Sequence, residues 1–282
     1  MALLEGKVSL VTGAGRGIGR AIALALAREG SAVVVNDLGC ERDGSGRDPS
    51  VAESVAEEIR AAGGKAVASA HSVTERSEVE ALFQAAVAAF GRVDALVNNA
   101  GVIADKSLFD MSDAQWRSVT DTHLTGTFLC SQAVAQLFRK QKTGGGIVNM
   151  TSVAGLLGNL GQSNESASKA GIYGLTRTAS IELQRFGVRV NAIAPIARTR
   201  LTQDLPMFEK VNGTLEPEHV APAVVFLLSD LSEDLSGTTL GVAGGRISTF
   251  ELVESEGRIK EADGGIWTPE EIRDHFPGIS RT

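Results

Sequence analysis

Glu165 and Lys169 lie four residues apart in the stretch SNESASKAG, which spans Ser163 to Gly171. If this stretch begins a helix, that spacing places both side chains on one face. A carboxylate beside an ammonium group is ionised at pH 7, because the positive charge opposes any rise in its pKa from burial. An ionised Glu165 can accept a proton but has none to donate. The pair therefore indicates general-base chemistry.

A glycine-rich stretch, TGAGRGIG from Thr12 to Gly19, has the composition of a phosphate-binding turn. Its first glycine allows a tight turn, and the later ones let the backbone approach a pyrophosphate and let a helix pack on a strand. The helix that starts here would offer free N–H groups and a partial positive charge. A strand before the stretch and a helix after it predict dinucleotide binding rather than a plain turn. The residues expected to contact the dinucleotide here are Gly13, Arg16, Gly17, Ile18 and Gly19.

Two charged residues bear on which dinucleotide would bind. Asp37 ends the second predicted strand, where a carboxylate can accept hydrogen bonds from the adenosine ribose hydroxyls and would repel a 2′-phosphate. That favours NAD over NADP. Arg16 argues the other way, because a basic residue in the glycine turn can hold a 2′-phosphate, although a solvated surface arginine is the alternative interpretation. We give more weight to Asp37 and expect NAD.

Short apolar runs alternate along the chain with longer stretches of helical periodicity. The runs are β-rich and bounded by glycine or polar residues, as buried strands are. This alternation predicts an α/β fold: a Rossmann-like, doubly wound parallel sheet with helices on both faces. The predicted strands are Lys7–Val11, Ala32–Asn36, Ala66–Ala70, Ala95–Asn98, Gly146–Met150, Val188–Ile193 and Thr239–Val242. The predicted helices are Ile18–Glu29, Val51–Ala62, Ser77–Phe90, Ser112–Lys140 and Ser163–Phe186.

The composition is that of a globular chain, with 282 residues of which 43% are hydrophobic and 22% charged. A net charge of −7 argues against nucleic acid or an anionic membrane as the main partner, and no apolar run reaches the roughly 20 residues of a membrane span. No signal peptide, metal site or disulfide framework is indicated, so a cytoplasmic setting is expected. We expect a single domain over residues 1–245 and a C-terminal extension over residues 246–282, which packs on that domain or on a neighbouring subunit.

Two polar segments lie outside the alternating pattern. Gly39–Ser50 is polar and rich in glycine, which predicts a loop between the second strand and the next helix. In the extension, Thr268 can cap a helix, with Pro269 in its first position and Glu271 closing a capping box. A short helix is expected there, over Pro269–His275.

Several of these motifs occur in a fixed order: TGAGRGIG, then NNAG at Asn98–Gly101, then Ser152 and the ESASK segment. Together they resemble the classical short-chain dehydrogenase/reductases, from about Leu4 to Gly245. The strings VVNDLG, DTHLTGTF, GNLGQSN, RVNAIAP and RLTQ are similar to those of one branch. That branch comprises the (3R)-hydroxyacyl-CoA dehydrogenase units of peroxisomal multifunctional enzymes type 2, also known as 17β-hydroxysteroid dehydrogenases. The resemblance implies a nicotinamide-dependent oxidoreductase that interconverts a secondary alcohol and a ketone.

The resemblance also implies roles for single residues. Ser152 corresponds to the serine that hydrogen-bonds the substrate carbonyl. Lys169 corresponds to the lysine that holds the nicotinamide ribose and lowers the pKa of a catalytic tyrosine. His123 stands where most of the family has the asparagine of a proton relay, as it does in the multifunctional-enzyme branch. A satisfied buried histidine is the alternative interpretation of His123.

Further residues are implied on the cofactor side. Asn98, Ala100 and Gly101 would lie along the adenosine side and stabilise the central sheet, although Asn98 could simply cap a strand end. The segment from Pro195 to Thr199 would line the nicotinamide carboxamide. Most of the family has Pro-Gly where this chain has Pro-Ile.

Glu165 falls where the family has its catalytic tyrosine. The single tyrosine of the chain, Tyr173, is eight residues further on, about 12 Å along a helix, and is too distant to replace it. Because an ionised carboxylate cannot donate a proton, ketone reduction should be impaired, while general-base work stays open. Three interpretations compete: an altered copy of a tyrosine enzyme, an oxidoreductase with a carboxylate base, and a non-redox acid/base enzyme or cofactor-binding scaffold.

The segment Ala197–Thr214 should cover the substrate, as the corresponding segment does in the family. It combines apolar Leu201, Leu205, Met207 and Phe208 with basic Arg198 and Arg200, which suits an apolar substrate with a phosphate-bearing handle such as CoA; a surface-exposed arginine pair is the alternative. The apolar faces of the two longest predicted helices resemble those with which relatives assemble. We therefore expect a homodimer or homotetramer that acts on a small-molecule substrate.

Overall fold

The first strand of the sheet, β1 (Val8–Thr12), is buried along its whole length and pairs in parallel with β2 (Ala32–Asn36) and β4 (Ala95–Asn98). The remaining strands are β3 (Ala66–Ser69), β5 (Gly145–Met150), β6 (Val188–Ile196), β7 (Thr239–Ala243) and β8 (Arg246–Thr249). Their order is β3-β2-β1-β4-β5-β6-β7-β8, and β8 alone runs antiparallel to its neighbour. The computed structural model describes residues 2–202, 215–261 and 264–280. The predicted doubly wound parallel sheet is confirmed.

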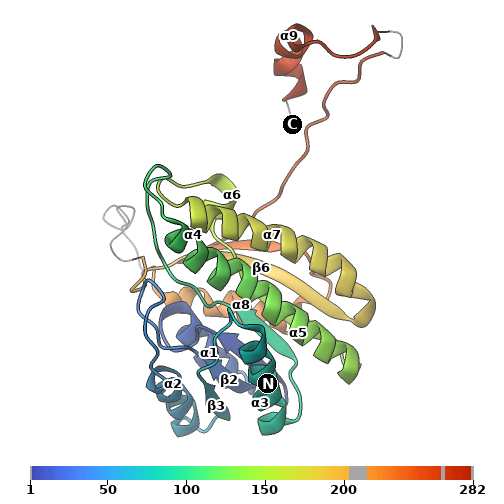
Figure 1. Ribbon diagram of the computed structural model, residues 1–282. Coiled ribbons are helices and arrows are strands. Elements are labelled where there is room, and N and C mark those ends of the chain that lie inside the picture. The colour runs from blue at the N-terminus through green and yellow to red at the C-terminus, as the bar shows by residue number, and fades with distance from the viewer. Residues whose placement is uncertain (1, 203–214, 262–263, 281–282) are drawn as a thin grey trace. The chain divides into compact units, whose positions relative to one another are not determined.

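Helices cover both faces of this sheet (Figure 1). One face carries α1 (Gly17–Arg28), α2 (Ser50–Ala61) and α8 (Ala221–Leu228), and the other carries α3 (Arg76–Phe90), α5 (Gly126–Gln141) and α7 (Ser163–Leu183). The remaining helices of the described residues are α4 (Asp113–Thr120), α6 (Val153–Leu157) and α9 (Pro269–Ile279), with short turns of other helix types between them. None of the helices described is long and apolar enough to cross a membrane.

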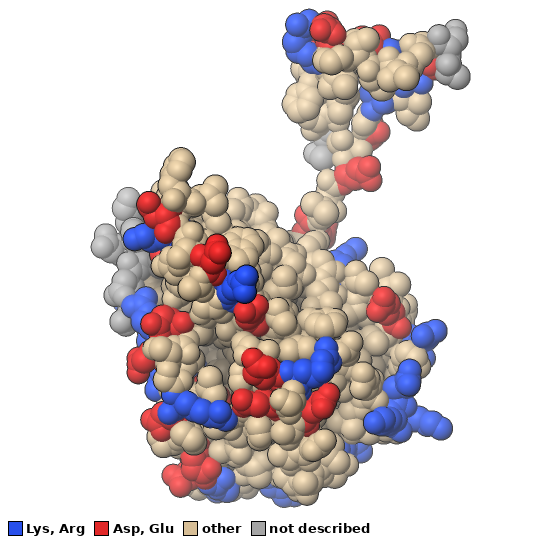
Figure 2. All heavy atoms as spheres, in the orientation of Figure 1, with Lys and Arg blue, Asp and Glu red and all other residues tan. Residues whose placement is uncertain are grey.

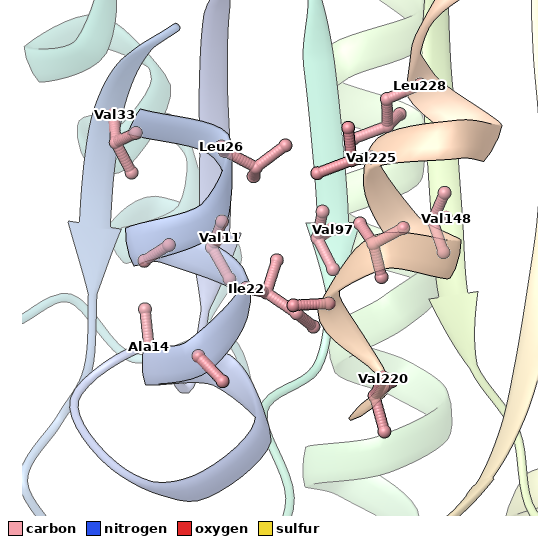
Figure 3. Packing of buried hydrophobic residues seen from close by; sticks show 14 of the residues in the cluster. Val11, Ala14, Ile22, Leu26, Val33, Val97, Val148, Val220, Val225 and Leu228 are labelled. Atoms are coloured by element: carbon pink, nitrogen blue, oxygen red, sulfur yellow. The ribbon is translucent and has the colours of Figure 1, made fainter. Parts of the chain in front are cut away.

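Neighbouring strand residues pack into opposite layers, because successive side chains of a strand point to opposite faces. Val11 lies in the α1–α2–α8 layer, where Figure 3 shows it near Ile22 and Leu26 of α1. Its neighbour Leu10 lies in the α3–α5–α7 layer, in one cluster with Phe138. The two layers fix the sheet from both sides and hold the carboxyl ends of its strands in place.

The predicted helix Ser112–Lys140 is not continuous. It consists of α4, a π-helical turn at Asp121–Thr125 and α5. A π-helical turn holds one residue more than an α-helical turn, and such turns are frequent at functional sites. The prediction was wrong at this point because the apolar periodicity does not reveal the wider turn. The helix predicted at Ser163–Phe186 ends at Leu183 and continues as a 3₁₀ turn.

Three elements were not predicted from the sequence: α6, α8 and β8. The chain folds as two compact units, Met1–Thr249 and Phe250–Thr282, so β8 belongs to the first. In the second unit the predicted capping box is confirmed, since Glu271 N donates to Thr268 Oγ1 at 3.2 Å and Thr268 N donates to Glu271 Oε2 at 2.8 Å. The helix α9 runs to Ile279, beyond the predicted end. How the extension packs stays a prediction.

Candidate active site

A cavity of about 840 Å³ opens at the carboxyl ends of the parallel strands. Ligands of open α/β sheets bind at this edge, because the loops that follow the strands converge there. The lining includes all but one of the fifteen residues that were predicted to take part in catalysis or cofactor binding. They are Gly13, Arg16, Gly17, Ile18, Gly19, Asp37, Ala100, Gly101, His123, Ser152, Glu165, Lys169, Pro195 and Thr199.

The glycine turn between β1 and α1 is shaped for close backbone contact. Gly13 has a φ of +62°, and a Cβ added there would lie 2.8 Å from the Cα of Ala100. Asn99 ties the two loops together, because its Nδ2 donates to the Thr12 and Gly13 carbonyl oxygens at 3.0 Å each. No side chain caps the start of α1 at Arg16. Gly17, Ile18 and Gly19 at the start of α1 line the cavity, where free N–H groups could bind a pyrophosphate.

The two residues that bear on cofactor choice both line the same cavity. Asp37 accepts hydrogen bonds from Gly15 N at 2.8 Å and from Gly39 N at 2.7 Å, so the backbone orients both of its carboxylate oxygens. Arg16 donates from Nη1 to the Cys40 carbonyl oxygen at 3.2 Å, and Arg200 donates from Nη2 to the same oxygen at 2.9 Å. The Asp37 carboxylate and the guanidinium groups of Arg16 and Arg200 therefore all bind the backbone of the segment just after β2, at Gly39 and Cys40.

Ser152 and Lys169 both line the cavity near the end of β5. Ser152 caps α6 and accepts a hydrogen bond from Ala154 N at 3.1 Å. Lys169 lies on α7, is 7% exposed, and donates from Nζ to the Met150 carbonyl oxygen at 2.8 Å. Burial lowers the pKa of Lys169, while the negative charge of Glu165 acts in the opposite direction. The ammonium group is therefore held by the backbone of the strand end.

The side chains of Glu165 and His123 lie next to each other in the lining of the cavity. Glu165 Oε2 lies 3.6 Å from His123 Nδ1, and both atoms are fully buried with no hydrogen-bond partner among the described residues. The imidazole projects from the π-helical turn, and its Nε2 lies 3.0 Å from Val102 N and 2.9 Å from Val102 O. Burial lowers the pKa of His123, and Glu165 opposes this effect more strongly than any other group. His123 is thus a neighbour of Glu165, which the sequence did not predict.

Asn98 does not line the cavity. It is buried in β4, and its Nδ2 donates to Ser131 Oγ at 3.0 Å and to Asn149 Oδ1 at 2.8 Å. Its contacts thus support the part of the prediction that concerned the sheet, not the part that concerned the adenosine. Tyr173 is likewise outside the lining, on α7.

Several lining residues were missed by the sequence reasoning. His71 lies two residues after the end of β3, and its backbone carbonyl accepts a hydrogen bond from Asn36 Nδ2 at 2.9 Å. Gln162 precedes α7 and donates from Nε2 to Asp105 Oδ2 at 2.7 Å. The position of His71 after a predicted parallel strand was a usable signal, whereas Gln162 had none. Of the predicted substrate-covering segment, residues 203–214, with Leu205, Met207 and Phe208, lie outside the described residues.

The described part of the chain contains no group of three His, Cys, Asp or Glu side chains arranged to hold a metal ion. Backbone N–H groups and arginine can bind a phosphate, and the glycine turn offers both. The glycine cradle, the uncapped helix and the oriented Asp37 fit a nicotinamide dinucleotide.

A family model described as short chain dehydrogenase matches residues 7–209. The chain belongs to the short-chain dehydrogenase family. The resemblance seen in the motifs is therefore confirmed, and members of this family use NAD or NADP. A crystal structure of a short chain dehydrogenase from Mycobacterium avium is similar, with a TM-score of 0.85 and 42% identity over 98% of this chain and 95% of that one.

Two relatives have more specific names. The hydroxyacyl-CoA dehydrogenase ChsB1 of Mycobacterium tuberculosis is 40% identical over 291 residues, covering 98% of this short-chain dehydrogenase and 90% of the relative. The peroxisomal multifunctional enzyme type 2 of Drosophila melanogaster is 41% identical over 255 residues, covering 90% of this chain. The match spans only 42% of the Drosophila enzyme, which is therefore a much longer protein.

Proposed function

We propose that this short-chain dehydrogenase interconverts a secondary alcohol and a ketone of a hydroxyacyl thioester, a steroid or a similar apolar substrate, with NAD as its preferred cofactor. One observation carries the proposal: a single cavity is lined by the glycine turn, Asp37, Ser152 and Lys169. The name of the Mycobacterium tuberculosis relative supports the hydroxyacyl-CoA class. Mixed charges over the face shown in Figure 2 and the net charge of −7 argue against a polyanionic partner.

The chain would hold the dinucleotide with the glycine turn at its pyrophosphate, Asp37 at the adenosine ribose and Lys169 at the nicotinamide ribose. The bound nicotinamide supplies hydride transfer. Ser152 would donate a hydrogen bond to the substrate oxygen, and Pro195 to Thr199 would flank the carboxamide. Asp37, Ser152, Lys169, Pro195 and Thr199 all line the cavity.

Glu165 determines which direction this site favours. As a carboxylate it can take the proton of an alcohol, but it has no proton to donate to a ketone. We therefore expect oxidation to be slow but measurable and reduction to be weaker than in a tyrosine enzyme. The second candidate is a non-redox acid/base enzyme, or a cofactor-binding scaffold, on the same fold. Oε2 of Glu165 lies beside His123 and has no hydrogen-bond partner among the described residues, which favours the acid/base enzyme over the scaffold.

Assembly and location are further expectations. Phe128 on α5 is 41% exposed and Ile181 on α7 is 73% exposed, which supports a homodimer or homotetramer built on these helices. The composition favoured the cytoplasm, whereas the Drosophila relative is named as peroxisomal. Chromatography with light scattering would decide the first point, and fractionation of cells would decide the second.

The decisive experiment on function has two steps. NADH fluorescence is first titrated with the full chain, and saturable binding is expected; absence of binding would overturn the redox proposal. A panel of 3-hydroxyacyl-CoA thioesters, hydroxysteroids and simple secondary alcohols is then tested with NAD. Turnover of a substrate without any change in nicotinamide absorbance would instead support the non-redox candidate.

A further inference from the structure

We propose that Glu165 and His123 form a carboxylate–imidazole pair, in which the Nδ1–H of His123 holds Oε2 of Glu165 while Oε1 takes the substrate proton. Glu165 is then a catalytic residue and His123 a positioning residue that acts through it. The identity of the substrate rests on the proposed function, but the pair is a property of the chain alone and can be tested without substrate.

The pairing follows from two buried atoms that lack any other partner. His123 Nδ1 and Glu165 Oε2 are fully buried, have no hydrogen-bond partner among the described residues, and lie 3.6 Å apart. This distance leaves no room for a water between them. It exceeds a formed hydrogen bond, and catalytic hydrogen bonds are often long before substrate binds and shorten afterwards. A small shift of either side chain closes the pair.

The backbone of Val102 permits the tautomer that this pairing requires. Its N–H lies 3.0 Å from His123 Nε2 and its carbonyl oxygen lies 2.9 Å from the same atom. If Nε2 accepts from Val102 N, the ring carries its proton on Nδ1 and donates it toward Glu165. If Nε2 were protonated instead, a bare Nδ1 would face a carboxylate oxygen, which is repulsive. The negative charge of Glu165 therefore selects the Nδ1–H tautomer.

The backbone of Gly101 packs closely against the His123 ring. A Cβ added at Gly101 would lie 2.7 Å from His123 Cε1 and 3.0 Å from Nε2, so the imidazole rests directly on the Gly101 backbone. The π-helical turn fixes the backbone of His123 itself. The position of the ring is thus set by the fold.

Burial is the largest influence on His123 and favours a neutral ring, with Glu165 acting against it. Lys169 on α7 also acts on His123, and Glu165 and Arg42 act on Asp105, in the segment after β4. Burial lowers the pKa of His123, and Lys169 adds to this effect. The imidazole then has one proton, and that proton lies on Nδ1.

Glu165 keeps one oxygen for the substrate. Its side chain lines the cavity and is 16% exposed, and Oε2 is the oxygen that is fully buried against His123. In the oxidation direction the substrate O–H bond breaks, an O–H bond forms on Oε1, and the electron pair stays on the substrate oxygen. Because Oε2 accepts from Nδ1–H before and after this transfer, His123 neither gains nor loses a proton.

The tautomer is measured first, on the full chain without substrate. Labelling with ¹⁵N-histidine gives four imidazole rings to resolve, each with two nitrogen signals, because the chain has four histidines. We expect His123 to carry its proton on Nδ1 at pH 7, and to carry it on Nε2 in Glu165→Leu, where Val102 O is the remaining acceptor. His71, whose Nδ1 lies 2.8 Å from Ser69 Oγ, is the internal control and should not change. A wild-type His123 protonated on Nε2 overturns the proposal.

The role in catalysis is tested by the pH profile of alcohol oxidation at saturating NAD. His123→Leu should lower kcat at least tenfold and move the acidic limb to higher pH, since the carboxylate loses its donor. His123→Gln, whose amide can donate to Oε2, should restore the limb. If the acidic limb of the pH profile stays in place in His123→Leu, the positioning role of His123 is overturned. Failure of NADH to bind would overturn the proposed function instead, and the tautomer measurement would still decide the pair.

Discussion

Lys169 Nζ donates to the Met150 carbonyl oxygen at 2.8 Å, so the side chain reaches from α7 to the last residue of β5. Ser152 follows that strand end two residues later, and a Cβ added at Gly155 would lie 2.5 Å from the Cβ of Lys169. The position of the ammonium group is therefore set by the strand and by the packing of α6 against α7, and Glu165 contributes only its charge.

Lys169→Met should lower the activity of the protein without lowering its stability. Removing the ammonium group should lower turnover about 10²-fold or more, the range typical of proton-transfer and positioning groups. Burial disfavours the charged lysine, so the unfolding free energy should stay within about 1 kcal/mol of wild type or rise. Urea unfolding and steady-state rates check this. A large fall in stability would show that the Met150 contact is mainly structural.

Glu165→Tyr should restore reduction if the frame is otherwise that of a tyrosine enzyme. A phenol near Lys169 can donate a proton to a ketone, and such general-acid groups contribute about 10² to 10⁴ in rate. NADH consumption with a 3-oxoacyl thioester measures the gain. Glu165→Phe is the matched control, since it supplies the ring without the hydroxyl. Equal rates in the two variants would contradict a missing phenol as the cause.

The stability of the fold should fall as the pH is lowered from about 6.5, the ordinary pKa of histidine. Burial lowers the pKa of His123, so below that pH the unfolded chain binds a proton that the folded chain does not. Asp105, whose pKa is raised mainly by burial, acts with the opposite sign at lower pH. His123→Leu should flatten the slope of the urea midpoint against pH between 7 and 5. An unchanged slope would mean that other groups cause it.

Cofactor preference should respond in opposite directions to two substitutions. Asp37→Asn removes a negative charge that would face a 2′-phosphate, and like charges in a binding site cost several kcal/mol. We expect the ratio of kcat/KM for NAD over NADP to fall about tenfold or more. Arg16→Gln should raise the same ratio. If both variants lower it, the effect comes from the shape of the glycine turn, because Asp37 also orients Gly15 N.

Gly101→Ala should be costly because of His123. Its Cβ would lie 2.7 Å from Cε1 of the ring, and overpacking of this kind costs about 1–3 kcal/mol. The cost should shrink when His123→Ala is combined with it, as a double-mutant cycle would show. Gly174→Ala on α7 is the control: a Cβ there would meet nothing within 4 Å, so this change should be neutral or stabilising. Equal losses in both backgrounds would point to a cause other than the ring.

The sequence sufficed for the sheet because its parallel strands are buried on both faces and read as unbroken apolar runs, as in Val33 to Val35. The same property hid α8, whose sequence APAVVFLL is apolar almost all round and so lacks an amphipathic stripe. The glycine turn and Lys169 were predictable because their spacing is local. The contact between Glu165 and His123 was not, since it depends on how two separate helices pack and on the wide turn between α4 and α5.

Because of that wide turn, the geometry of the site depends on the number of residues between α4 and α5. Deleting one residue from Asp121–Thr125 would let α4 and α5 join as one regular α-helix, and the side chains of the turn itself would rotate about the helix axis by up to about 100° while the flanking helices kept their faces. His123 would then leave the neighbourhood of Glu165 although its own codon was untouched. Substitution scans, which keep the residue count constant, would miss this sensitivity; a scan of single-residue deletions would find it.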